Sequence, residues 1–424
     1  MRIVGAPLSG AWLWGLILVA AATVSRSQET PAATAAATDT AGAAKAATDT
    51  VAVAQRDILD VLQEWIFHRR LEPAAQGEFS PGIAWSILPT LSYNPVYGLA
   101  FGASFSGAGK RGLDPESKPS ALSLSGNYST TGQVQFQFRS DLFLGADNYL
   151  LRADVRYLDT DRSTWGLGPI GEGQQEYPMH FALVRLYGTV YRRTIGSTYI
   201  GLGYHFDEFS DIEDERAALG ESTPFTTYSG AGVTHTKAAG ISLNLLGDTR
   251  NSLVNPTEGY YLSGSFRDYI EPLGSERNWQ EFWLDVRMYP HVPRQSNNVL
   301  AFWIYSWMSF GPAPYLGLPA NGWDTQGRGA RGYLQGRIRG QDQIYFETEY
   351  RMQLRRDGLL GAVGFFNLTA TSLPETETFG RPDPGGGAGL RLKFNKRSNT
   401  NLAIDHAWGR DGSKGWFFAM TEVF

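Results

Sequence analysis

IYFETEYRMQLR, residues 344 to 355, alternates polar and apolar side chains with a period of two. Its polar positions are Glu347, Glu349, Arg351, Gln353 and Arg355. Its apolar positions are Phe346, Tyr350, Met352 and Leu354. Because successive side chains of a β-strand point to opposite faces of a sheet, this stretch predicts a strand with one ionic face and one apolar face.

The same pattern recurs through residues 82–424, for example in 133–141 (QVQFQFRSD), 279–289 and 390–395. The region holds about 16 candidate strands in an unbroken series, without the linkers that separate the modules of long β-sandwich proteins. Lipid offers no hydrogen-bond partner to a strand edge, so a membrane sheet must close on itself. The sequence therefore predicts an all-β fold, a transmembrane antiparallel β-barrel of about 16 strands with a short N-terminal helix.

Connection lengths give a second indication of a barrel. Short turns are expected at 145–148, 194–197, 355–358 and 395–399, and each neighbours a long segment such as 210–236 or 311–343. Transmembrane barrels have short periplasmic turns and long external loops. The alternation predicts that both chain termini lie on the periplasmic side.

Composition excludes several other classes of protein. The 424 residues include no cysteine, which removes disulfide frameworks and thiolate metal sites. Lys and Arg number 37 against 42 Asp and Glu, so there is no basic excess for nucleic acid. Beyond the first 25 residues, no run reaches the roughly 18 apolar residues that a membrane-spanning helix requires.

The N-terminal region predicts export. Residues 1–27 contain Arg2 and an apolar run at 11–22, which together are typical of a signal peptide. Residues 28–55 are rich in Ala and Thr, have little to bury, and are expected to form a disordered linker. Residues 56–81 are expected to form a short periplasmic helix and a connector, followed by the barrel domain at 82–424. The export signal and the barrel pattern together predict the bacterial outer membrane.

The helix is amphipathic, with apolar residues at helical spacing within 56–70. Three placements are open from the sequence alone. The helix can lie on the inner-leaflet surface, enter the barrel lumen or pack on its own domain. No function is assigned to it.

The last predicted strand, residues 416–424, places Phe418, Met420 and Phe424 on one face. A terminal aromatic strand of this kind resembles those that outer-membrane insertion machinery recognises, so Phe424 is a candidate C-terminal insertion signal. Glu422 interrupts the apolar face and is expected at the periplasmic interface, where a charge costs only about 0–1 kcal/mol.

Motifs for catalysis are scarce. The sequence has no G-x-S-x-G, H-E-x-x-H or P-loop motif, and Gly166, Gly168 and Gly171 fit a dinucleotide pattern without a following helix. We therefore predict no enzyme activity, no catalytic residues, no cofactor and no metal site. A barrel phospholipase built from a serine and a histidine stays open, because such residues meet across strands rather than in sequence.

An arginine-rich and glycine-rich loop, residues 327–340 (GRGARGYLQGRIRG), stands apart from the strands. It has the flexibility to fold into a polar lumen and the charge to pair with carboxylates there. Its residues Ala330 to Tyr333 match the [V/I]-R-G-[F/Y] signature of the BamA/TamA-type bacterial surface antigen barrels, with Ala at the first position. Residues 248–259 and 389–408 also resemble this outer-membrane protein assembly and translocation superfamily. The likeness covers about residues 82–424.

The resemblance implies roles for individual residues. The loop motif Arg331, Gly332 and Tyr333 would enter the lumen, where Arg331 would pair with acidic residues of the late strands. The candidate partners are Asp405, Asn367, Glu347 and Glu349. Asp405 is the best of them, whereas Asn367 stands where the family often has an aspartate and cannot supply a charge.

The resemblance also implies a function, with one departure. Residues 28–81 are too few for a periplasmic polypeptide-transport (POTRA) domain, which captures clients in characterised members. The expected function is assistance in outer-membrane protein assembly or translocation, and the alternative is a passive pore or a structural surface antigen. Expected partners are outer-membrane lipid, the barrel-insertion machinery and unfolded outer-membrane protein clients, but not nucleic acid.

Overall fold

The computed structural model describes residues 55–67, 82–94, 98–110, 118–171, 173–325, 327–373, 376, 378–396, 399–419 and 422–424. The expected signal peptide (1–27), nearly all of the linker (28–55) and the connector after the helix (68–81) lie outside the described residues.

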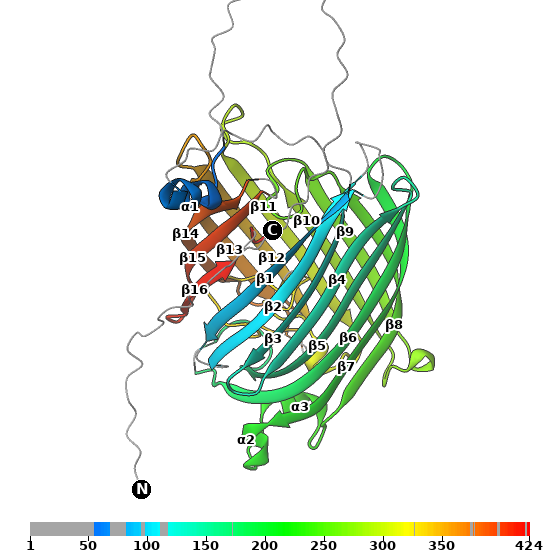
Figure 1. Cartoon of the computed structure of the whole chain (residues 1–424). Coiled ribbons are helices and arrows are strands. Elements are labelled where there is room, and N and C mark those ends of the chain that lie inside the picture. The colour runs from blue at the N-terminus through cyan, green and yellow to red at the C-terminus, as the bar shows by residue number, and fades with distance from the viewer. Residues whose placement is uncertain are drawn as a thin grey trace, which may run out of the picture.

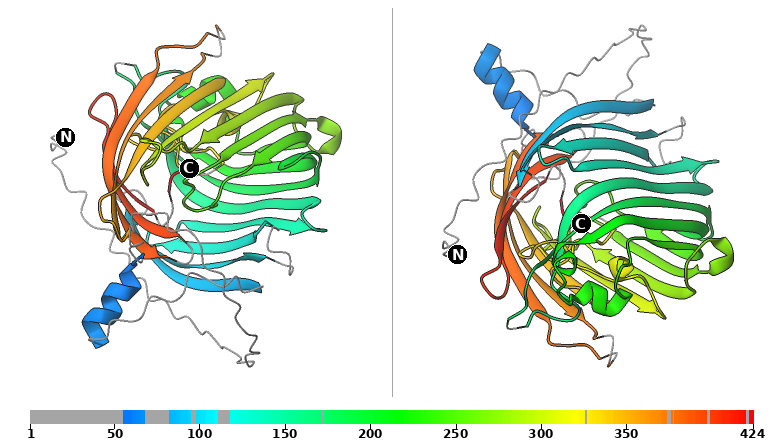
Figure 2. Two further views of the ribbon diagram at one scale, coloured as in Figure 1. Left: turned by 90° about the horizontal axis from the view of Figure 1, so that it is seen from above. Right: turned by 90° about the horizontal axis from the view of Figure 1, so that it is seen from below.

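A single 16-stranded sheet forms the body of the protein, and every strand is antiparallel to the strands before and after it in sequence. The sheet curls around a central lumen, as Figures 1 and 2 show. The strands are β1 (Gly82–Asn94), β2 (Gly98–Lys110), β3 (Ser120–Ser129), β4 (Val134–Leu144), β5 (Tyr149–Thr164), β6 (Tyr177–Arg193), β7 (Thr198–Asp214), β8 (Thr236–Asp248), β9 (Tyr260–Tyr269), β10 (Trp279–Met288), β11 (Val299–Phe310), β12 (Asp342–Gln353), β13 (Leu360–Thr371), β14 (Asp383–Asn395), β15 (Thr400–Trp408) and β16 (Lys414–Ala419). The helical elements are α1 (Ile58–Phe67), α2 (Glu215–Ala218), α3 (Pro224–Ser229), η1 (Glu271–Leu273) and η2 (Tyr315–Gly317).

The period-two alternation separates a lumen face from an outer face. On β11, Trp303 and Tyr305 are fully buried inside the barrel, whereas Ile304 between them is 40% exposed on the outer surface. On β12, Glu347 and Glu349 point inward and are fully buried. The strands are therefore apolar toward lipid and polar or aromatic toward the lumen, as the transmembrane barrel requires.

The two ends of the barrel differ in their connections. We call "turn end" the end that carries connections 145–148, 194–197, 249–259, 289–298, 354–359 and 396–399, and "loop end" the opposite end. The loop end carries the long segments 165–176, 215–235 and 311–341, but also short turns at 130–133 and 409–413. The expected alternation of short and long connections is therefore only approximate.

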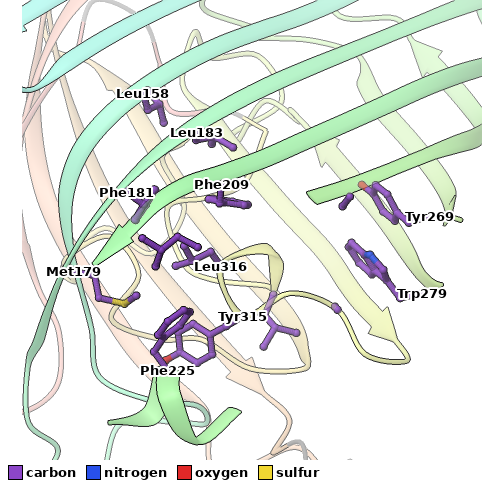
Figure 3. Close-up of a cluster of buried hydrophobic side chains, with 14 residues drawn as sticks. Leu158, Met179, Phe181, Leu183, Phe209, Phe225, Tyr269, Trp279, Tyr315 and Leu316 are labelled. Atoms are coloured by element: carbon purple, nitrogen blue, oxygen red, sulfur yellow. The ribbon is translucent and has the colours of Figure 1, made fainter. Parts of the chain in front are cut away.

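At the loop end, a cluster of buried apolar residues joins the long loops to the barrel wall (Figure 3). Phe181 and Phe209 of the wall meet edge to face, with ring centroids 5.7 Å apart. Phe225 of α3 packs in the same way against Tyr315 of η2, at 5.6 Å. These contacts bury the apolar side chains of the loops and hold residues 311–341, which we call the lumen loop, against β6 and β7.

The first and last strands do not pair with each other. Within the described residues, no backbone pairing joins β1 to β16, and β16 is much shorter than β1. The expectation that the last strand runs to Phe424 is wrong, because β16 ends at Ala419. Phe424 is 3% exposed and lies in the lumen, so its expected place on the lipid face is also wrong. The physical reason is that Arg391 and Asn401 bind the Glu422 carboxylate inside the barrel, which draws the chain inward.

Helix α1 lies outside the barrel wall near β14, as all three views show (Figures 1 and 2). Lys396, at the turn end, donates through Nζ to Asp60 at 2.7 Å and through its backbone N–H to Asp57 at 3.0 Å. The lumen placement is therefore excluded. No helix in the described part of the chain combines the length and the apolar character needed to cross a bilayer.

Candidate functional site

The lumen loop crosses the interior of the barrel. On one side, the backbone oxygen of Thr325 accepts from Arg139 of β4 at 2.7 Å. On the other side, Arg331 donates to Asp405 of β15 at 2.6 Å. Because β4 and β15 stand far apart in the order of the sheet, these contacts anchor the loop to two separate parts of the wall.

Local backbone geometry presents Arg331 to the wall. Ala330 has a φ of 62° and Gly332 a φ of 108°, so the chain bends sharply on both sides of the arginine. The Ala330 N–H donates to the Tyr345 hydroxyl at 2.9 Å. A Cβ atom at residue 332 would lie 2.7 Å from the backbone oxygen of Trp408, and glycine tolerates the positive φ without strain. Glycine is therefore required at this position of the motif.

The Arg331 guanidinium meets three carboxylates. Its Nε donates to Glu347 Oε1 at 3.1 Å and its Nη1 to Asp405 Oδ2 at 2.6 Å, while Nη2 pairs with Glu349. The guanidinium plane also lies 3.5 Å from the centre of the Phe365 ring. Arginine suits this place because its planar fork presents five donors in fixed directions, which lysine does not.

Further charged residues extend the contacts into a network. Arg351 Nε donates to Glu349 Oε2 at 2.8 Å, and Arg391 pairs with Asp405. Arg391 Nε also donates to Glu422 Oε2 at 2.7 Å. We call these residues, together with Arg331 and Glu347, the lumen network. All are less than a tenth exposed, so each charge depends on its partners for stabilisation.

Two neutral residues hold the loop motif in place. Asn367 Nδ2 donates to the backbone oxygen of Arg331 at 3.0 Å. The Tyr333 hydroxyl donates to the backbone oxygen of Pro384 and accepts from the Arg410 N–H at 2.9 Å. Asn367 has no charge and cannot form the ionic contact expected of an aspartate at this position. Its hydrogen bond to the loop backbone fixes the loop instead.

The C-terminal residues 422–424 are bound to the lumen network through Glu422 and Phe424. Glu422 accepts from Asn401 Nδ2 at 2.9 Å as well as from Arg391. The Phe424 ring packs on Trp303 with centroids 5.3 Å apart, and its backbone oxygen accepts from Arg351 Nη2 at 2.8 Å. The expected interfacial position of Glu422 is wrong, because Glu422 is 5% exposed inside the barrel.

The structure thus brings Arg331, Glu347, Glu349, Asp405 and Asn367 together in the lumen, and places Phe424 beside them. Sequence reasoning did not assign Arg351, Arg391, Glu422, Tyr345 or Phe365 to the site. The signal for Arg351 was available, because it shares the ionic face of β12 with Glu347 and Glu349. No pattern in the sequence predicts that Glu422 turns inward, since this position depends on residues of β14 and β15.

A second polar cluster lies elsewhere in the lumen. The His205 Nε2 and Ser242 Oγ atoms are 2.8 Å apart, and Asn244 Nδ2 donates to the same Ser242 oxygen at 2.7 Å. This is the serine and histidine contact that the phospholipase alternative requires. However, His205 Nδ1 is buried without a hydrogen-bond partner among the described residues, and the charges that act on the ring are the cations Arg185 and Arg267. An imidazolium formed during catalysis would therefore lack an acceptor and be repelled.

The lumen network holds the lumen loop against the wall. Its carboxylates are occupied by guanidinium groups, and the described residues contain no group of three or more His, Asp or Glu arranged to hold a metal ion. What the arrangement does is couple the lumen loop to β12, β14 and β15 and to the C-terminal residues. A change at any one of these elements alters the partners of the others.

Comparison with solved structures identifies the architecture. The chain is similar to the crystal structure of BamA from Haemophilus ducreyi lacking POTRA domains 1–3, with a TM-score of 0.51 over 80% of this chain and 69% of that chain. The two sequences are 14% identical, so the likeness concerns the fold. No protein-family model and no curated protein matches the sequence. The chain has a BamA-type barrel fold, the fold that the loop motif and the strand pattern predicted.

Proposed function

We propose that this protein is a bacterial outer-membrane barrel that assists the assembly or translocation of other outer-membrane proteins. The observation that carries the proposal is the free edge of β1. Within the described residues, this strand of Gly82–Asn94 pairs with β2 on one side and with no strand on the other. An unpaired edge presents a row of N–H and C=O groups that binds an incoming strand.

The surrounding membrane favours the binding of a client strand at this edge. Backbone groups that face hydrocarbon without a partner cost several kcal/mol each, so the edge favours a client strand that satisfies them. The chain's own last residues do not occupy this place, because Glu422 and Phe424 are held in the lumen by Arg391 and Arg351. We propose the outer membrane as the location of the barrel and other outer-membrane proteins as its clients.

The lumen loop supports a gated barrel over a passive pore or a structural surface antigen. A loop fixed to both β4 and β15 obstructs the interior. Single-channel conductance separates the alternatives. A barrel that conducts weakly until residues 327–340 are deleted supports gating, whereas large conductance with the loop intact supports a pore.

Site-specific photocrosslinking tests client binding directly. A photoreactive residue at Ile87, an exposed residue of β1, is expected to capture outer-membrane protein precursors during their synthesis. The matched control is the same residue at Ile241, which is similarly exposed on β8, a strand paired on both sides. Equal capture at both sites, or normal assembly of other barrels after depletion of this protein, would contradict the proposal.

We also propose that the barrel is not an enzyme. The support is chemical: the His205 ring has a hydroxyl at Nε2 but no acceptor at Nδ1. A serine hydrolase needs that acceptor to orient the imidazole and to stabilise its charge.

A further inference from the structure

Helix α1 presents an apolar stripe that no described part of the chain covers. Leu62, Trp65 and Ile66 are 43%, 76% and 56% exposed. Their spacing of three and four residues places them on one side of the helix. Large apolar side chains grouped on one face indicate a contact with an apolar partner.

The opposite side of α1 is attached to the rim of the barrel at the turn end. Asp57 and Asp60 bind Lys396 in the β14–β15 connection. The Arg56 N–H donates to the backbone oxygen of Asp357, in the β12–β13 connection, at 2.9 Å. Two neighbouring turns thus fix the start of the helix at the level where the strands leave the membrane.

From this attachment, α1 extends outward from the wall rather than over the lumen (Figure 2). Exposed apolar residues also lie on the outer surface of the barrel toward this end. Leu354 is the first residue of the β12–β13 connection, Leu390 lies on β14, and both are 54% exposed. The apolar stripe of α1 and these exposed wall residues therefore lie toward the same end of the barrel.

We propose that α1 is an interfacial helix whose residues Leu62, Trp65 and Ile66 insert into the lipid leaflet at the turn end of the barrel. Lipid is the occupant that the position favours, because a helix fixed at the membrane level and directed away from the wall meets acyl chains before any protein surface. Helices of this kind lie in the plane of the interface with their apolar face buried about 5–10 Å. Tryptophan is enriched at this level because its ring is apolar and its N–H is polar.

Through α1, the lipid contact restrains the position of the turns beside the last strands relative to the membrane. Lys396 precedes β15, and β15 pairs with β16, the strand whose other edge is unpaired within the described residues. A helix embedded in one leaflet resists vertical movement of these turns relative to the bilayer. The inference does not depend on the proposed assembly function, since a pore would be held in the same way.

The absence of cysteine from the sequence allows a clean test, because a single introduced cysteine carries the only label. The full chain is reconstituted in phosphatidylethanolamine and phosphatidylglycerol vesicles with a nitroxide at W65C. The matched control is Q63C, which lies on the exposed polar side of the same helix. A label at L390C, on the lipid-facing wall, defines the signal of a residue in the bilayer. Folding of each variant is checked by its gel mobility before and after heating.

Accessibility to two relaxing agents gives the result. The W65C label is expected to collide with oxygen, which concentrates in lipid, and to be protected from a water-soluble nickel chelate, as at L390C. The Q63C label is expected to show the reverse. Nickel accessibility at W65C equal to that at Q63C would mean a solvated helix and overturn the proposal. Protection of W65C from both agents would mean that protein covers it, and dipolar broadening between labels would identify a second copy; either result also overturns it.

Discussion

Gly389 of β14 lies directly opposite Asp405 of β15, and a Cβ atom at residue 389 would come within 1.8 Å of Asp405 Oδ1. The missing side chain leaves the space in which this carboxylate turns toward Arg331 and Arg391. A glycine on one strand therefore permits an ion pair that joins the next strand to the lumen loop.

Substitution of Gly389 by alanine is expected to displace Asp405 and destabilise the barrel. Breaking a buried ion pair costs about 3–5 kcal/mol, and partial displacement should cost a fraction of this. The control is Gly364→Ala on β13, where an added Cβ meets no atom within 4 Å. The measurement is the temperature at which the folded form disappears from an unheated gel. Equal melting of the two variants would mean that the space at Gly389 is unimportant.

Replacement of Arg331 by alanine is expected to cost about 3–5 kcal/mol, because it leaves Glu347, Glu349 and Asp405 buried with less compensating charge. Lysine should recover only part of the loss, since one ammonium group does not reproduce the planar fork. Arg337→Ala, in the same loop, removes a contact to Gln174 outside the lumen network and is the control. Thermal unfolding in detergent checks the order of the variants. An Arg331→Ala barrel that melts with the wild type would contradict the structural role.

Loss of the Glu422 side chain is expected to release the C-terminal residues from the lumen, because Arg391 and Asn401 both bind its carboxylate. A cysteine at Phe424 reports the release through its rate of reaction with a polar maleimide. The rate should be low with Glu422 present and rise strongly in Glu422→Ala. A cysteine at the exposed Lys414 should react rapidly in both backgrounds. Rapid reaction at residue 424 while Glu422 is intact would show that the tail is not held inside.

The attachment of α1 is expected to weaken in acid. Partial burial raises the pKa of Asp60, but the Lys396 ammonium and the Asp57 N–H lower it more, so the net pKa lies below the ordinary value of 3.8. A lowered pKa in the folded state means that this carboxylate stabilises the attachment above pH 3.8 and loses that effect as the pH falls through its folded pKa. A nitroxide at Q63C should therefore become more mobile as the pH is lowered from neutral through the folded pKa of Asp60, which lies below 3.8. In Asp60→Asn, the label should be more mobile than in the wild type at neutral pH and should respond less to pH; unchanged mobility in both proteins would refute the contact.

Ser242 is expected not to react with a fluorophosphonate probe, because His205 lacks the acceptor that would make it an effective base. The test uses folded protein with a fluorescent probe, and Ser242→Ala as the control. A band that is present in the wild type and absent in Ser242→Ala would show a reactive serine and reopen the hydrolase alternative.

The partners of Arg331 could be predicted only in part from the residues alone. The loop motif and the period of β12 and β15 predict an arginine among Asp405, Glu347 and Glu349, and the structure brings these groups together. Arg391 was missed as a partner, although its strand was expected, because pairing across strands depends on register. Phe424 was assigned to the wrong face because period two was carried past Ala419, where the strand ends.

The residues alone predicted about 16 strands, the separation of an apolar face from a polar face, and the residues able to form ion pairs. These properties follow from local alternation, since each side chain's face is set by its position along its own strand. Three features depend on the folded chain instead: within the described residues β1 and β16 do not pair with each other, Glu422 and Phe424 turn into the lumen, and α1 lies outside the wall. Each of these depends on groups distant in sequence, such as Arg391 for Glu422 and Lys396 for Asp60, whose contacts exist only once the sheet has curled.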